Sequence, residues 1–146
     1  MIEQFQGKDG RAALMTGLRG QFLVDGSSDI ADGIASSMQL REYFEDEAIF
    51  TQGERGGDIC LILSGKVSIR IDGQQVAIVN AGMHVGEIGM LEPFKGRSAT
   101  VIAMDTVVAA HITQTRFFEM AKVHSDLWRR LALELAHRLV KAQIKG

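Results

Sequence analysis

The stretch VGEIGMLEPFKGRSATV, residues Val85 to Val101, is the part of this chain around which we expect the rest to fold. It begins with Gly86 and Glu87, passes through a short apolar turn, and closes on Arg97 and Ser98. We expect the turn to be one or two turns of helix, whose first backbone N–H groups are unpaired and suit a small anion. Gly86 has no Cβ, so a ligand can approach this backbone closely.

Three side chains in this stretch have the chemistry of a sugar-phosphate site. Arg97 carries a planar fork that can grip a phosphate bidentately. Glu87 is an ionised acceptor that suits a hydroxyl such as a sugar 2′-OH, and Ser98 adds a hydroxyl of its own. Plainer interpretations exist: a surface ion pair for Arg97, a helix cap for Glu87 and an ordinary strand position for Ser98. The residue types alone leave both sets of interpretations open.

The stretch resembles the phosphate-binding cassette of cyclic nucleotide-binding domains, the module of bacterial cyclic-AMP receptor proteins and kinase regulatory subunits. That cassette reads G-E-[LI]-[AG]-[LM], then a loop, then R-[ST/A]-A-x-V, and GEIGM with RSATV fits at every position. The resemblance extends from Asp29 to Lys145. Two residues depart from the pattern: Val85 stands where an aromatic residue is common, and Met83 where an Asp often follows the turn glycine.

The resemblance implies an α+β fold, an antiparallel β-roll or jelly-roll with flanking N-terminal and C-terminal helices. It implies a cyclic nucleotide ligand, cAMP or cGMP, and a last helix that folds over the base as a lid. The contact residues that it implies are Gly86, Glu87, Ile88, Arg97, Ser98 and Ala99 in the cassette, Ile69 and Val76 on the strands that wall the base, and Gln143 in the lid.

Composition indicates one small domain. The chain has 146 residues, of which 46% are hydrophobic and 23% charged, enough for a single core. A net charge of −2 gives no overall signal for nucleic acid or membrane binding. The one cysteine, Cys60, lies in the apolar run ICLIL, so we expect a core residue rather than a nucleophile, and a reducing compartment. No apolar run is long enough to span a bilayer, and we expect a cytoplasmic protein.

Strand patterns dominate the middle of the chain. Val67, Ile69 and Ile71 alternate with polar residues, which is the period of a strand with one buried face. Asp72-Gly73 then predicts a tight hairpin. Further short runs, up to a last one at 107–112, bring the total to about eight strands with frequent turns, the pattern of an antiparallel roll.

Helical patterns are expected at both ends. Residues 1–28 are broken by glycines and predict an arm that is partly helical or loosely packed, before the main domain at 29–146. Ser28-Asp29 predicts an N-cap for a helix over 30–37. Near the end, Thr113 or Thr115 predicts the cap of one helix, and a longer one spans 127–143. The basic residues of this last helix are interpreted as a solvated face, and its apolar stripe as core, lid or the contact of a weak homodimer.

The leading hypothesis is a stand-alone regulatory module that binds a cyclic nucleotide and signals to a separate effector protein by rearranging its terminal helices. The alternative is an interaction or scaffolding domain of the same fold that no longer binds nucleotide. We expect no catalysis, no cofactor and no direct DNA binding, because the matching residue sets are missing. We also expect no metal, since the histidines at 84, 111, 124 and 137 lack the spacing of ligands.

Overall fold

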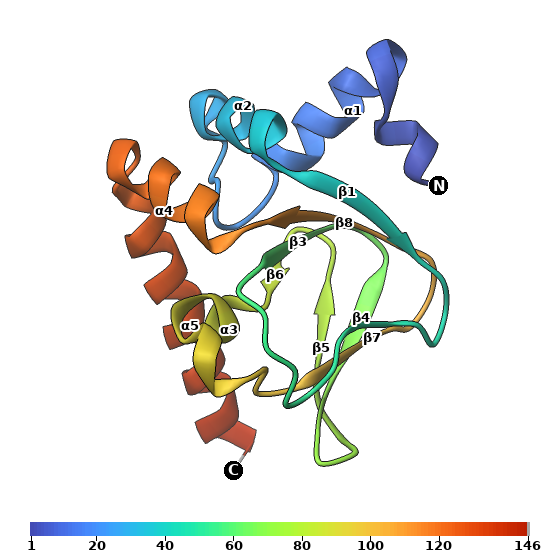
Figure 1. Ribbon diagram of the computed structural model, residues 1–146, viewed down its shortest axis with the longest axis vertical. Coiled ribbons are helices and arrows are strands. Elements are labelled where there is room, and N and C mark those ends of the chain that lie inside the picture. Colours follow the sequence, from blue (N-terminus) through green and yellow to red (C-terminus); the bar gives the residue numbers. More distant parts are fainter. Residues whose placement is uncertain (146) are drawn as a thin grey trace.

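The computed structural model describes residues 1–145 and shows a roll of two four-stranded antiparallel sheets with helices along one side (Figure 1). One sheet has the strand order β1-β8-β3-β6 and the other has the order β2-β7-β4-β5. The strands are β1 (Gln39–Tyr43), β2 (Ala48–Phe50), β3 (Ile59–Ser64), β4 (Lys66–Ile71), β5 (Gln74–Asn80), β6 (His84–Val85), β7 (Thr100–Ala103) and β8 (Val107–Ile112). The predicted fold class is confirmed.

The helices come before, within and after the roll. In Figure 1, α1 and α2 lie above β1 and β8, and α5 runs past the short α3. The elements are η1 (Ile2–Phe5), α1 (Gly7–Arg19), α2 (Ser28–Ser37), α3 (Glu87–Leu91), η2 (Pro93–Lys95), α4 (Gln114–Val123) and α5 (Asp126–Lys145), where η marks a 3-10 helix.

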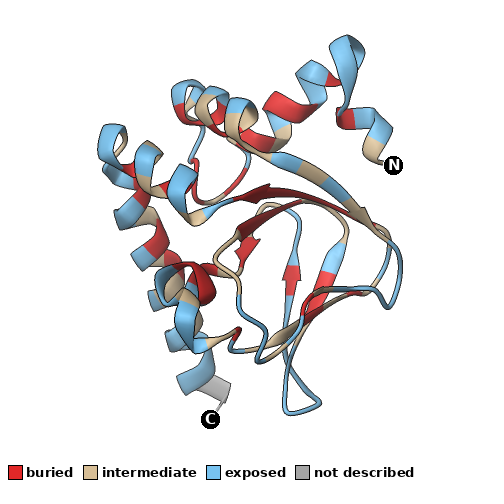
Figure 2. Ribbon diagram, viewed as in Figure 1, coloured by how far each residue is buried: buried red, intermediate tan, exposed pale blue. Residues whose placement is uncertain are grey.

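Strand β8 separates two hydrophobic cores, and all six of its residues are buried (Figure 2). Val107 and Ala109 face the inside of the roll, together with Cys60. Val108 and Ala110 face the helices on the other side of the sheet. This alternation follows from the period of two of a strand, and it places Cys60 in the core, as expected.

The hairpin between β4 and β5 forms where Asp72-Gly73 predicted it. Both residues have positive φ, 51° and 82°, which is the backbone of the tight turn that matches the twist of paired strands. The hairpin is exposed for most of its length, and β5 buries only Val79.

The first 28 residues are packed against the roll, so the loosely packed arm considered above does not describe them. Leu18 and Leu23 are buried in the core under the helices. The buried Gln21 Nε2 donates to the carbonyl of Ile62 at 2.8 Å, and the N–H of Phe22 donates to the carbonyl of Gly82 at 2.8 Å. This segment therefore braces the turn that leads into the cassette.

Helix starts agree with the sequence to within one or two residues. Helix α2 begins at Ser28, and the side chain of Ser27, rather than Ser28 or Asp29, accepts from the N–H of Ile30. Thr113 caps α4 by accepting from the N–H of Arg116 at 3.3 Å, which decides between the two threonines. Side-chain oxygens at these positions satisfy N–H groups that have no partner in the helix.

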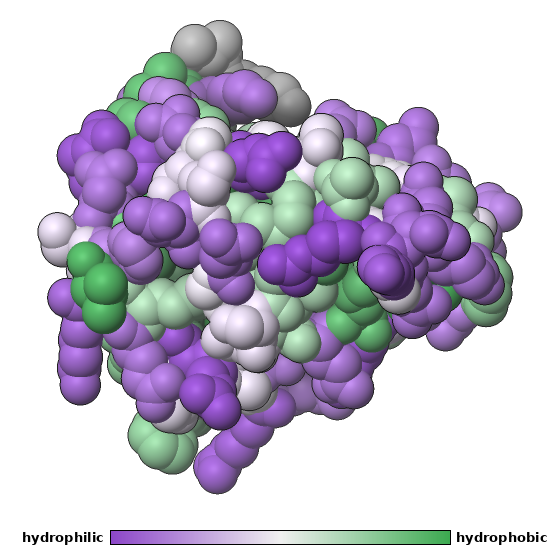
Figure 3. Space-filling view, turned by 90° about the horizontal axis from the view of Figure 1, so that it is seen from above, coloured by the Kyte–Doolittle hydropathy of each residue, from purple (hydrophilic) through white to green (hydrophobic). Residues whose placement is uncertain are grey.

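Hydrophilic side chains dominate the face seen in Figure 3, and hydrophobic ones lie in small separate areas between them. Within residues 1–145 no helix combines the length and the apolar character that crossing a bilayer requires.

Candidate functional site

The cassette begins at Gly86, directly after β6. Gly86 has φ 91°, a left-handed backbone that residues with a Cβ rarely adopt. The space is closed as well, because a Cβ here would lie 2.8 Å from both the carbonyl oxygen of Asp58 and the ring of Phe50. Glycine at this position therefore lets the chain turn into α3 while packed against two neighbouring segments.

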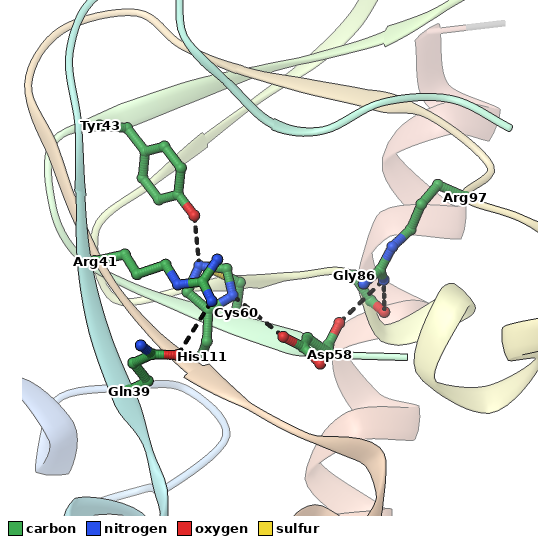
Figure 4. Close-up of polar contacts among 8 residues, drawn as sticks. All are labelled: Gln39, Arg41, Tyr43, Asp58, Cys60, Gly86, Arg97 and His111. Carbon is green, nitrogen blue, oxygen red and sulfur yellow. Dashed lines mark hydrogen bonds and ion pairs between the residues drawn. The ribbon is translucent and has the colours of Figure 1, made fainter. Parts of the chain in front are cut away.

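Arg97 is buried and folded back onto the cassette, with only 7% of its surface exposed. Its Nη1 donates to the carbonyl oxygens of Asp58 at 3.0 Å and Gly86 at 3.1 Å (Figure 4). The guanidinium carbon lies 3.7 Å from the centre of the Phe50 ring, in a cation–π contact. The surface ion pair considered for Arg97 is therefore wrong, because the guanidinium is held inside the site.

Glu87 is also buried, with 3% of its surface exposed. Its Oε1 accepts from Arg138 Nη1 at 2.5 Å, and Oε2 has no hydrogen-bond partner within the described part of the chain. Burial raises the pKa of the Glu87 carboxyl, and the positive charge of Arg138 opposes this effect. A buried carboxylate with one free oxygen is suited to accept from a hydroxyl.

Arg138 comes from α5 and makes two further contacts, one within this helix and one to β6. Its Nε donates to Glu134 Oε1 at 2.7 Å, one helical turn away, and its Nη2 donates to the carbonyl of His84 at 2.6 Å. The solvated face expected for this helix is wrong at Arg138. A Glu four residues before an Arg is a known helix pair, yet the sequence could not show that the same arginine reaches the cassette.

A cavity of about 160 Å³ opens in front of the cassette, between Arg97, Arg138 and strand β4. Seven of the nine predicted contact residues line it: Ile69, Gly86, Glu87, Ile88, Arg97, Ser98 and Ala99. Phe50 and Arg138 line it as well, and the sequence did not single out either of them.

A second, larger cavity of about 700 Å³ lies between the β4–β5 hairpin and α5. It shares Ile69 and Arg138 with the first cavity, and the predicted Val76 lies on its wall. Gln143 lines neither cavity and is exposed in the last part of α5, so its contact with a base stays a prediction.

Two of the four histidines are buried, and neither belongs to a metal-ligand cluster. Burial lowers the pKa of His84 to about 3, helped by the charge of Arg138. Burial and the charge of Arg41 lower the pKa of His111 to about 4. Among residues 1–145, no three His, Cys, Asp or Glu side chains gather as metal ligands would.

The fold and this site together define a β-roll ligand-binding domain whose cavity carries one buried arginine and one buried glutamate. A family model described as the cyclic nucleotide-binding domain matches residues 40–124. The chain belongs to the cyclic nucleotide-binding domain family.

Curated relatives and solved structures agree with this assignment. The chain is 33% identical over 141 residues, 97% of its length, to Pycsar effector protein XpPycTIR of Xanthomonas perforans, and covers 46% of that protein. It is 28% identical over 109 residues, 71% of its length, to the cAMP-activated global transcriptional regulator CRP of Escherichia coli, and covers 52% of it. It also resembles the Catabolite Activator Protein of Thermus thermophilus, with a TM-score of 0.75 and 27% identity over 86% of this chain and 61% of that one. The chain thus spans about half the length of the curated relatives it matches.

Proposed function

We propose that this domain senses a cyclic nucleotide, cAMP or cGMP, and reports its binding by moving α4 and α5. The observation that carries the proposal is that Arg97 and Glu87 line one cavity. The cationic side chain can bind the phosphate of a cyclic nucleotide, and the acidic one can bind its sugar. The domain itself performs no catalysis in this proposal.

The phosphate would bind to Arg97. Nη1 already carries both hydrogen bonds to the backbone, and Nε and Nη2 make none of the hydrogen bonds found within residues 1–145. These free donors form the edge of the guanidinium fork that matches two phosphate oxygens. The hydroxyl of Ser98, the next residue, is exposed and lines the same cavity.

The sugar would bind to Glu87. Its Oε2 has no hydrogen-bond partner among residues 1–145 and can accept from the 2′-OH, while Oε1 stays on Arg138. The base would then extend past Ile69 into the larger cavity, between Val76 and α5. The lid contact of Gln143 with the base belongs to this proposal and would require α5 to shift.

Ligand binding would be transmitted to α5, because Arg138 connects this helix directly to Glu87, the residue proposed to bind the sugar. We propose that an effector protein reads the shift. Two observations support a signalling role. Two relatives are named a Pycsar effector and a cAMP-activated regulator, and Leu139 and Val140 are exposed on α5, where they could contact an effector or a second copy. We propose a cytoplasmic location, since the buried thiol of Cys60 fits a reducing compartment.

Calorimetric titration of the chain with cAMP and with cGMP tests the proposal. We expect one of them to bind at one site per chain, and 5′-AMP, whose phosphate is not cyclised, to bind much more weakly. The same titration on the Arg97→Ala variant should lose most of the affinity. If neither cyclic nucleotide binds the folded chain, the nucleotide proposal fails and an interaction domain of the same fold is the function that remains.

A further inference from the structure

His111 lies inside the roll at the centre of a polar cluster that the proposed ligand contacts do not include (Figure 4). Its Nε2 is 2.8 Å from the hydroxyl of Tyr43 and 3.6 Å from Cys60 Sγ. Its Nδ1 faces Asp58 Oδ2 at 3.6 Å, and its ring meets the ring of Phe50 edge to face, with centroids 6.1 Å apart.

Two of these neighbours are also the groups on which Arg97 rests. The carbonyl of Asp58 accepts from Arg97 Nη1, and the face of the Phe50 ring lies under the guanidinium. His111 therefore neighbours both supports of Arg97, Asp58 at 3.6 Å and the Phe50 ring at 6.1 Å between centroids. Strand β8 carries His111, and the buried position leaves its ring little room to move.

The protonation state of His111 suits a fixed orientation. Burial and Arg41 lower its pKa to about 4, so the ring is neutral at pH 7 with one N–H and one acceptor nitrogen. A carboxylate can only accept, so the tautomer that suits both neighbours has its proton on Nδ1, facing Asp58 at 3.6 Å, just beyond hydrogen-bond distance. The Tyr43 hydroxyl then donates to Nε2.

The cluster has no features of a nucleophilic site, although a thiol, an imidazole and a carboxylate meet in it. Cys60 is fully buried, and burial raises the pKa of its thiol, which keeps it protonated and unreactive. Neither of the two cavities described above is lined by Cys60 or by His111. The contacts of His111 with Asp58 and Phe50 therefore favour a role in positioning neighbouring side chains.

We propose that His111 is a positioning residue for Arg97: oriented by Tyr43, it fixes Asp58 and Phe50, which in turn aim the guanidinium at the ligand cavity. This inference rests on the proposed function for its consequence, which is tighter binding of the phosphate. Its structural part, the order of the Arg97 side chain, can be measured without any nucleotide.

The test compares His111→Leu with a matched control, Val108→Ala. Val108 lies on the same strand and is equally buried, but it faces the core under the helices and touches neither Asp58 nor Phe50. The readout in the free chain is the NMR order of the Arg97 Nε–H group. We expect this group to lose order in His111→Leu and to keep it in Val108→Ala, whereas equal order in both variants would overturn the proposal.

Binding provides the second readout. We expect His111→Leu to weaken cyclic nucleotide binding by roughly 3- to 30-fold, the range found for residues that act through others. In an Arg97→Ala background the same change should have no further effect on affinity, because the side chain that His111 is proposed to position is absent. His111→Asn, whose amide nitrogen replaces Nδ1, should restore part of the affinity. Full additivity of the changes at 111 and 97 would overturn the proposal.

The failures of the two proposals are distinguishable. If the parent chain binds no cyclic nucleotide, the proposed function fails, and the NMR comparison still decides whether His111 orders Arg97. If His111→Leu does not fold, Tyr43→Phe replaces it, since it removes only the hydroxyl that orients His111. That variant should shift Arg97 order and affinity in the same direction by a smaller factor, and no shift in either would overturn the inference.

Discussion

Arg138 and Glu87 are 51 residues apart in the sequence, and they form the shortest link between α5 and the cassette, with Nη1 and Oε1 2.5 Å apart. The same guanidinium also donates to Glu134 and to the carbonyl of His84, so three acceptors hold it in place. A residue proposed to bind the sugar is thus held by the helix proposed to move.

Arg138→Met should lower the free energy of unfolding by about 2–3 kcal/mol. It leaves the buried Glu87 carboxylate unpaired, and a third of the Arg138 side chain is exposed, so the loss stays below that of a fully buried pair. The control is Arg129→Met, which breaks a fully exposed pair with Asp126 on the same helix and should lower stability far less, because water screens that pair. Denaturant unfolding measures both, and equal losses would contradict the burial argument.

The deficit of Arg138→Met should shrink as the pH falls. Burial raises the pKa of Glu87 above its ordinary value of 4.5, and removing Arg138 raises it further. When a carboxyl has a higher pKa in the folded state than in the unfolded state, its ionisation at high pH destabilises the fold. This destabilisation disappears as the carboxyl becomes protonated, while the pH falls from above the folded-state pKa toward 4.5. Unfolding of the variant and the parent at pH 7 and pH 5 measures this, and a deficit that grows at pH 5 would refute it.

The parent chain should lose stability between pH 6.5 and pH 4 because of its two buried histidines. Their folded-state pKa values, about 3 for His84 and about 4 for His111, lie below the ordinary value of 6.5. As the pH falls, the two histidines are therefore protonated in the unfolded chain before they are protonated in the folded chain, which stabilises the unfolded state. Each contributes up to about 3 kcal/mol over this window. A His84→Leu variant should show a flatter pH profile, and an unchanged slope would count against the assignment.

Arg97→Ala should weaken cyclic nucleotide binding by about 2–4 kcal/mol, because it removes a charged and bidentate contact. Arg97→Lys should recover only part of this, since an ammonium lacks the fork. Stability should fall as well, because the side chain packs on Phe50 and bonds to two carbonyls. Calorimetry on Arg116→Ala, an exposed arginine of α4, supplies the control, and parent-like binding by Arg97→Ala would refute the phosphate site.

Glu87→Gln should weaken binding less than Arg97→Ala does. The amide keeps the shape and one acceptor but loses the charge that strengthens the bond to a hydroxyl. A 2′-deoxy cyclic nucleotide should then bind the variant almost as well as the parent nucleotide does. Titration of both ligands on both proteins forms a double-mutant cycle, and full additivity would mean that Glu87 does not contact the 2′-OH.

Removing residues 142–146 should leave the fold intact, because the buried leucines of α5, Leu127 and Leu131, lie earlier in the helix. If the end of α5 is a lid, nucleotide should dissociate several-fold faster from the shortened chain, while its association rate barely changes. Stopped-flow dissociation measures this. Hydrogen exchange over 135–143 in the full chain should also slow on nucleotide addition, and no change in either would exclude the lid.

The residues of the cassette could be predicted because they are close together in the sequence. Gly86, Glu87 and Arg97 stand at the spacing that resembles the cyclic nucleotide-binding cassette, and the structure brings them to one cavity. The strands were predictable for the same reason, since a period of two reports which face is buried. The hairpin at Asp72-Gly73 is likewise a property of two adjacent residues.

The sequence by itself thus determined the individual strands, the hairpin and the helices at the ends, because each is encoded by residues within a few positions of one another. The roll and the cassette contacts followed from the resemblance that residues 85–101 carry. Only the tertiary structure decided that Arg138 reaches Glu87 and that the carbonyl of Asp58 holds Arg97. It also decided that His111 lies next to Asp58 and Phe50. A pattern in the sequence shows that a helix carries basic residues, but not which residues of the roll these side chains contact. Which distant side chains pair depends on how α5 and the strands pack, and packing is a property of the whole core.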